Sequence, residues 1–185
     1  MRRHETILRR EDAILVVVDY QQRLVDIMPN GPEVTQEIIR LVKGMKILEV
    51  PVIATEQYRK GLGPTVQGVA ELLNMEEVEE KLTFSCCGID PFIKLIGHHH
   101  RRQAVLVGIE AHVCVLQTAL DLLANGYQVH IPYDATCSRR DANRDNALER
   151  MKQAGVIITN TESVLFELTV QAGTEEFKQV KNLIA

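Results

Sequence analysis

The sequence contains no tryptophan, and aromatic residues make up only 4% of it. Proteins that stack on nucleic-acid bases, and membrane proteins with interfacial aromatic belts, depend on such side chains. Basic residues are not in excess either, since 21 Lys and Arg stand against 25 Asp and Glu, for a formal net charge of −4. We therefore expect neither a nucleic-acid partner nor a membrane partner.

Long hydrophobic runs and paired cysteines are also missing from the sequence. The first apolar run, residues 14–18, follows two acidic residues and is too short for a signal peptide or a membrane span. The four cysteines show neither the spacing of a zinc site nor that of a disulfide framework. These features predict a cytoplasmic protein with reduced thiols.

The length of 185 residues, 45% of them hydrophobic, suits a single domain over residues 1–185. Short apolar runs rich in Val and Ile cover residues 14–18, 52–55, 104–107, 128–132 and 156–159. Segments of helical periodicity between and after them cover residues 35–48, 91–97, 113–124, 141–154, 162–170 and 175–184. Because this alternation is typical of parallel strands covered on both faces by helices, we predict an α/β fold.

Open parallel sheets bind ligands beyond the carboxyl ends of their strands, so the residues that follow each run are candidates for a site. Asp19 directly follows the first run, where a buried carboxylate needs a cationic partner. Cys114 lies near the start of the helix after the third run, where helix amides can stabilise a thiolate and bind an oxyanion. Taken alone, Asp19 could equally be a structural cap and Cys114 a packing residue.

Three segments together resemble a known family. Residues 108–119, GIEAHVCVLQTA, resemble the nucleophile signature of isochorismatase-like cysteine hydrolases. The resemblance extends to VVDYQ at residues 17–21 and to EKLTFS at residues 80–85, in the same chain order as in the family. Residues 55–58, 61–66 and 161–166 resemble the isochorismatase domain-containing protein subgroup in particular.

This resemblance implies a three-layer αβα fold on a doubly wound, six-stranded parallel sheet, usually assembled into a homo-oligomer. It also implies a cis peptide bond between Ile109 and Glu110. In the implied reaction Cys114 attacks a small amide-like substrate, Asp19 accepts the thiol proton and Lys81 stabilises the thiolate. The backbone amides of Glu110 and Cys114 would hold the oxyanion. Without the resemblance, Lys81 would be interpreted as a solvated surface charge, because it follows an acidic stretch.

Six further residues near the strand ends or the triad are candidates for substrate binding: Gln21, Glu56, Gln57, Tyr58, Phe84 and His112. A turn anchored by hydrogen bonds explains residues 56–58 almost as well. A structural hydrogen bond within the turn explains His112 equally well. Cys137, at another strand-to-helix turn, is the second choice for the nucleophile.

No metal or nucleotide cofactor is predicted. Related nicotinamidases carry metal-binding histidines after the second strand, whereas residues 55–63 contain none. The run HHH at residues 98–100 cannot easily converge on one ion, since consecutive helical residues point in different directions. Gly61 and Gly63 do not continue as a dinucleotide or P-loop fingerprint.

The sequence leaves three functions open. The first is a cysteine-dependent hydrolase of a small amide-like molecule, which the presence of Asp19, Lys81 and Cys114 together favours. The second is a catalytically silent family member that acts as a binding or scaffold protein. The third is the cleavage of a vinyl ether of the isochorismate type, which need not use the cysteine. The identity of the substrate does not follow from fold and triad.

Overall fold

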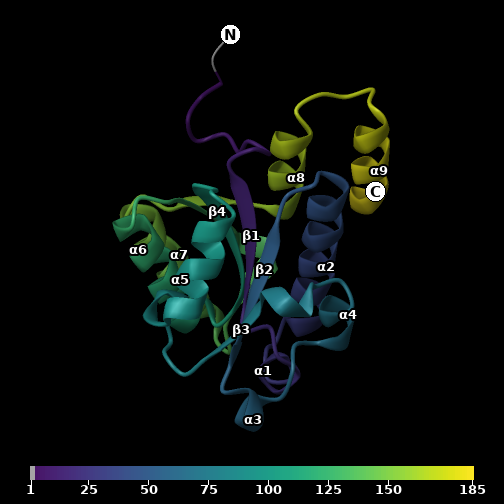
Figure 1. Ribbon diagram of the computed structural model, residues 1–185. Coiled ribbons are helices and arrows are strands. Elements are labelled where there is room, and N and C mark those ends of the chain that lie inside the picture. The colour runs from purple at the N-terminus through teal and green to yellow at the C-terminus, as the bar shows by residue number, and fades with distance from the viewer. Residues whose placement is uncertain (1–2) are drawn as a thin grey trace.

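The computed structural model describes residues 3–185 and contains one β-sheet with helices on both faces (Figure 1). The strands are β1 (Ala13–Val18), β2 (Val52–Gln57), β3 (Val78–Lys81), β4 (Gln103–Ile109), β5 (Gln128–Pro132), β6 (Thr136–Cys137) and β7 (Ile157–Thr159). The longer helices are α2 (Gly31–Ile47), α5 (Asp90–His98), α6 (Leu116–Ala124), α7 (Asp141–Gln153), α8 (Thr161–Thr169) and α9 (Glu175–Ile184). The short helical segments are α1 (Gln22–Val25), α3 (Arg59–Leu62), α4 (Gln67–Ala70), η1 (Met75–Glu77), η2 (Cys86–Gly88), η3 (Ala111–Val115) and η4 (Tyr133–Ala135). Within residues 3–185, no helix is long and apolar enough to cross a membrane.

The strands pair in the order β3-β2-β1-β4-β5-β7, and all of these pairs are parallel. The two-residue strand β6 pairs with the end of β4. The order runs outward from β1 in both directions, so the sheet is doubly wound with its switch point between β1 and β4. This confirms the predicted six-stranded parallel sheet and adds β6 to it.

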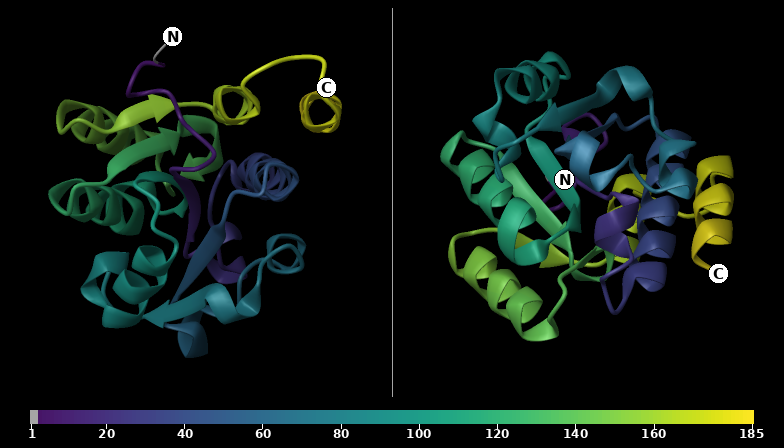
Figure 2. Two further views of the ribbon diagram at one scale, coloured as in Figure 1. Left: turned by 45° about the horizontal axis from the view of Figure 1, so that its top comes forward. Right: turned by 90° about the horizontal axis from the view of Figure 1, so that it is seen from below.

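The core consists of two apolar layers, one on each face of the sheet. Figure 2 shows the helices that cover these two faces. Leu15 and Val17 of β1 pack with α2, α8 and α9, whereas Ile14 and Val16 pack with α5, α6 and α7. Because successive strand residues point to opposite faces and both faces are covered, every residue of β1 is buried. The unbroken apolar run in the sequence therefore has a direct structural reason.

All five predicted strands and all six predicted helices are present; residues 128–132 and 175–184 have the predicted bounds, and the other segments have shifted ends. Helix α2 begins at Gly31 instead of residue 35, and the predicted helix 113–124 opens with the π-helical turn η3. Strand β3 was not predicted, because its sequence, VEEK, has a single apolar residue. It lies at the edge of the sheet, where pairing with β2 alone holds it.

Gly108 allows β4 to approach β1 closely just before the candidate site. Its φ angle is 117°, and a Cβ atom built on it would lie 2.1 Å from the carbonyl oxygen of Val18. Any side chain at this position would therefore push apart the two central strands. Since Val18 and Gly108 are paired in the sheet, such a shift would reach Asp19, the next residue along β1.

Candidate active site

Asp19, Lys81 and Cys114 come together at the carboxyl edge of the sheet. Asp19 follows β1, Lys81 is the last residue of β3, and Cys114 lies in η3 directly after β4. The site thus lies at the switch point between β1 and β4, where open parallel sheets bind ligands. The exposed fractions of Asp19, Lys81 and Cys114 are 0%, 2% and 6%. The solvated position that local sequence indicates for Lys81 is therefore wrong.

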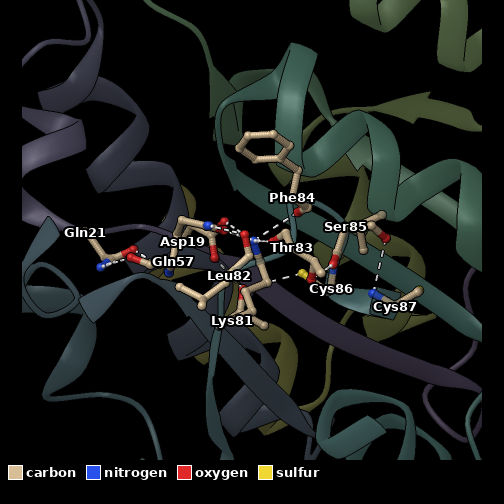
Figure 3. Close-up of polar contacts among 12 residues, drawn as sticks. Asp19, Gln21, Gln57, Lys81, Leu82, Thr83, Phe84, Ser85, Cys86 and Cys87 are labelled. Carbon is tan, nitrogen blue, oxygen red and sulfur yellow. Dashed lines mark hydrogen bonds and ion pairs between the residues drawn. The ribbon is translucent and has the colours of Figure 1, made fainter. Parts of the chain in front are cut away.

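Lys81 is surrounded by hydrogen-bond acceptors (Figure 3). Its Nζ atom donates to Asp19 Oδ2 over 2.6 Å. The other acceptors are Gln57 Oε1 at 2.6 Å and the carbonyl oxygens of Thr83 at 3.0 Å and Phe84 at 2.9 Å. A neutral amine would turn its lone pair toward one of these oxygens, so the nitrogen is held as an ammonium with all three donors occupied. The ammonium of Lys81 thus lies against the carboxylate of Asp19.

Cys114 lies in a turn that follows a cis peptide bond. The peptide bond between Ile109 and Glu110 is cis, at the position that the resemblance implied. Burial, the largest cause, raises the pKa of the Cys114 thiol, the charge of Asp19 raises it further, and Lys81 lowers it. Burial and the charge of Asp19 therefore both oppose a thiolate on Cys114.

In the described part of the chain, the two backbone amides predicted to hold an oxyanion make no hydrogen bond outside their own turn. Within residues 3–185, the amide of Glu110 donates no hydrogen bond, and that of Cys114 donates none outside its own helical turn. The carboxylate of Glu110 points elsewhere, because it accepts from the amide and the Nε of Arg139 at 3.0 and 3.1 Å. Free amides next to a nucleophile are the donors that a developing oxyanion needs.

The polar groups of three predicted substrate-binding residues are already occupied within the protein. The Gln21 side chain accepts from the amide of Gln57 at 2.7 Å and donates to its carbonyl at 3.0 Å. The Gln57 side chain binds Lys81 and donates to the Leu82 carbonyl at 2.9 Å. Glu56 is 1% exposed and accepts from the amide and hydroxyl of Thr65. The structure thus gives all three residues anchoring contacts within the protein.

Tyr58, Phe84 and His112 are the accessible members of the predicted binding set. Tyr58 is 48% exposed and Phe84 55% exposed, and the Phe84 ring projects away from the ion pair (Figure 3). His112 is half-buried, with Nδ1 2.9 Å from Ser138 Oγ and Nε2 3.4 Å from Asn143 Nδ2. The hydrogen-bond partners of His112 therefore lie outside its own turn, at Ser138 and Asn143 near the start of α7.

Thr55 and Cys86 lie near Asp19, but the sequence did not indicate either of them as a site residue. Thr55 Oγ1 donates to Asp19 Oδ1 over 2.8 Å and lies 3.5 Å from the Sγ atom of Cys86. Burial, and next the charge of Asp19, raise the pKa of Cys86 to about 11. Thr55 stands two residues before Gln57, and alternate strand residues share a face. That spacing is the signal that could have identified Thr55.

Cys137 does not belong to this cluster. It packs in the core layer of α2 and α8, whereas Cys114 packs in the layer of α5 and α6 on the other face of the sheet. Burial first, and then the charge of Glu110, raise the pKa of Cys137 to about 12. The geometry therefore favours Cys114 over Cys137 as a nucleophile.

The run of three histidines at residues 98–100 has no metal-site geometry. The rings of His98 and His99 cross at 72°, and His99 Nε2 lies 3.3 Å from Glu77 Oε1. In the part of the chain that the structure describes, no group of three or more His, Cys, Asp or Glu residues is arranged to hold a metal ion.

Comparison with known proteins agrees with this fold. The isochorismatase domain family matches residues 13–163. The secreted isochorismatase effector Isc1 of Phytophthora sojae is 38% identical over 93% of this chain and 84% of its own length. Isochorismatase domain-containing protein 1 of Danio rerio is 44% identical over 78% of this chain, which spans about half (51%) of that relative. The structure of MAR1 ribonuclease from Caenorhabditis elegans superposes with a TM-score of 0.90 at 38% identity, covering 96% of this chain and 91% of that one. A family match over most of the sequence, with relatives of this similarity, shows that the chain belongs to the isochorismatase family.

Proposed function

We propose that the chain is a cysteine-dependent hydrolase of a small amide-like substrate, with Cys114 as nucleophile and Asp19 as base. The observation that carries the proposal is the buried ion pair of Lys81 and Asp19, 2.6 Å apart, beside a buried thiol that both charges influence. Buried charges are seldom retained for stability, so their convergence next to a thiol supports catalysis. Membership of the isochorismatase family supports the hydrolase class.

The raised pKa of Cys114 sets the order of the first step. Since burial and the charge of Asp19 disfavour a free thiolate, Asp19 accepts the thiol proton as Sγ forms a bond to the substrate carbonyl carbon. The carbonyl oxygen becomes an oxyanion, which the amides of Glu110 and Cys114 stabilise. Lys81 keeps a positive charge beside the site as the negative charge moves from carboxylate to oxyanion.

The second half of the reaction returns the protein to its starting state. The tetrahedral intermediate breaks its carbon–nitrogen bond, the leaving amine takes the proton from Asp19, and a thioester on Cys114 remains. Asp19 then removes a proton from water, which attacks the thioester carbon. The product acid leaves, and the proton returns to the Cys114 sulfur. No metal or redox partner enters this balance.

The substrate contacts follow from the side chains that remain free. Gln21, Glu56 and Gln57 are engaged in internal hydrogen bonds, and both ring nitrogens of His112 also have partners, so polar recognition falls to the backbone. Tyr58 and Phe84 are exposed aromatic rings near the strand ends and supply apolar contacts. This combination supports a small substrate with an apolar acyl part.

The proposal can be tested without a known substrate. Iodoacetamide labelling of each cysteine, measured by mass spectrometry from about pH 5 to about pH 9, should show Cys114 reacting fastest, because Asp19 accepts the thiol proton as the new carbon–sulfur bond forms. Asp19→Asn should slow this labelling, since the base is lost. Lys81→Ala should move the Cys114 profile to higher pH, because the Lys81 charge lowers the pKa of Cys114. If Cys114 reacts no faster than Cys137, the hydrolase proposal fails and the chain should be tested as a binding protein.

A substrate panel separates the alternatives. Small amides are compared with isochorismate and with single-stranded RNA, because relatives carry the names isochorismatase and ribonuclease. Cys114→Ala should abolish amide hydrolysis while circular dichroism stays unchanged, and Cys137→Ala is the matched control. Hydrolysis of isochorismate that survives Cys114→Ala would instead favour the vinyl-ether reaction. RNA cleavage as the only activity would overturn the amide assignment.

The assembly into a homo-oligomer stays a prediction of the resemblance. Phe166 and Val170, at the end of α8, are apolar and exposed by 37% and 60%. Light scattering should give a mass that is a multiple of the 20.9 kDa of one chain.

A further inference from the structure

The ion pair of Asp19 and Lys81 spans the end of β2. Asp19 follows β1 and Lys81 ends β3, and β2 lies between these two strands. In the sheet register Val18 pairs with Thr55, and Gln57 pairs with Lys81. The end of β2 is therefore next to both residues of the ion pair.

Residues at the end of β2 divide between two faces. Thr55 and Gln57 are two positions apart, so their side chains share a face, and both bind the ion pair. Glu56 points to the other face, where it accepts from Thr65 and pairs with Arg59 over 3.1 Å. The alternation of the strand thus assigns residues 55 and 57 to the triad and residue 56 to the neighbouring loop.

Thr55 fixes the plane of the Asp19 carboxylate. The terminal torsion of an aspartate is broad, so the rotamer alone does not set the orientation of its two oxygens. Here Thr55 Oγ1 donates to Oδ1 over 2.8 Å and Lys81 Nζ donates to Oδ2 over 2.6 Å. The Thr55 side chain is fully buried, which limits its own movement. Two donors from different strands therefore hold the carboxylate.

Gln57 fixes the ammonium of Lys81. Its Oε1 must face Lys81, which can only donate, and its Nε2 must face the Leu82 carbonyl, which can only accept. The Gln57 backbone is held in turn, since its amide and its carbonyl both bind the side chain of Gln21. The fully buried Gln21 also donates to the carbonyl of Gly63.

We infer that Thr55 and Gln57 are positioning residues, with Thr55 orienting the carboxylate of Asp19 and Gln57 holding the ammonium of Lys81. The inference deepens the proposed function and rests on it for its catalytic meaning. It replaces the sequence-based expectation that Gln57 contacts the substrate. Neither residue touches the reacting atoms, and both act through the charges that they hold.

The first test measures the second-order rate constant for iodoacetamide alkylation of Cys114 in the full chain, with Cys87 in the same sample as internal reference. Thr55→Val removes the donor at nearly constant shape and should slow Cys114 at least about tenfold, because the carboxylate can rotate away from the thiol. Thr55→Ser keeps the hydroxyl and should stay within about twofold of the wild type. Equal rates for the two variants would overturn the role of Thr55.

The second test does not depend on thiol chemistry. In protein labelled with ¹⁵N-lysine, the buried and fully bonded Lys81 ammonium should give a slowly exchanging signal, assigned by its absence in Lys81→Arg. Gln57→Met and Thr55→Val should weaken this signal, whereas Thr55→Ser should keep it. Gln67→Met is the control, because Gln67 donates only to Glu71 on the surface.

The two readouts separate the failures. An unchanged ammonium signal in Gln57→Met or Thr55→Val overturns the positioning role of that residue, whatever Cys114 does. Weakened signals together with an unreactive Cys114 in the wild type would support the positioning roles and refute the hydrolase. Weakened signals and slower alkylation together support both.

Discussion

Replacing Lys81 with methionine should destabilise the protein more than replacing Asp19 with asparagine, although the two residues form one ion pair. Both side chains are fully buried. In Lys81→Met the Asp19 carboxylate stays buried with the Thr55 hydroxyl as its remaining side-chain donor from the sheet. Breaking a buried pair in this way costs about 3 to 5 kcal/mol of unfolding free energy.

Asp19→Asn leaves Lys81 in a different position. The ammonium keeps three acceptors, Gln57 Oε1 and the carbonyls of Thr83 and Phe84, which match its three N–H donors. The expected cost is therefore about 1.5 to 3 kcal/mol, the value of one charge-assisted hydrogen bond. In the double variant the unpaired carboxylate is gone, so it should be more stable than Lys81→Met alone.

Urea denaturation, followed by circular dichroism at neutral pH, gives the free energies of unfolding of Lys81→Met, Asp19→Asn and the double variant. Lys178→Met is the control, because Lys178 pairs with Glu175 on the surface and should change stability by less than about 0.5 kcal/mol. If Asp19→Asn is as destabilising as Lys81→Met, the count of acceptors around Lys81 does not govern the pair and the reasoning is refuted.

Two further predictions concern the strands. Gly108→Ala should lower the free energy of unfolding by several kcal/mol, because the new Cβ would meet the Val18 backbone. Gly126→Ala is the control: Gly126 also has a positive φ but open space around it, so the cost should be only about 1 kcal/mol. Urea denaturation measures both costs, and equal values would contradict the clash. Burial lowers the pKa of His130 from 6.5 to about 4, so the unfolded chain binds a proton in this range that the folded chain does not. Stability should therefore fall as the pH falls from about 6.5 to about 4, by up to about 3 kcal/mol. His130→Gln should remove this component of the pH dependence, and an unchanged slope would speak against it.

Local sequence was sufficient where a pattern has a direct structural meaning. The apolar runs of β1 and β4 are buried on both faces, so they predicted a parallel sheet between helical layers. The segment around Cys114 combined a resemblance with a strand-to-helix turn, and both located it at the carboxyl edge. Asp19 at the end of an apolar run implied a cationic partner, and the structure provides one.

Only the tertiary structure decided what the charged and amide side chains do. Nothing local distinguishes Lys81 from a surface lysine, because the pairing of the edge strand β3 with β2 is what buries it. Gln21 and Gln57 looked free to bind a substrate, yet each is occupied by a partner more than twenty residues away in the chain. Similarly, the position of Cys114 in a helical turn suggested a lowered pKa, whereas burial and the carboxylate of Asp19 raise it. Hydrophobic periodicity indicates which face of a helix or strand is buried. Hydrogen-bond partners and local charge depend on which elements meet in space, and local patterns in this sequence did not show which elements those are.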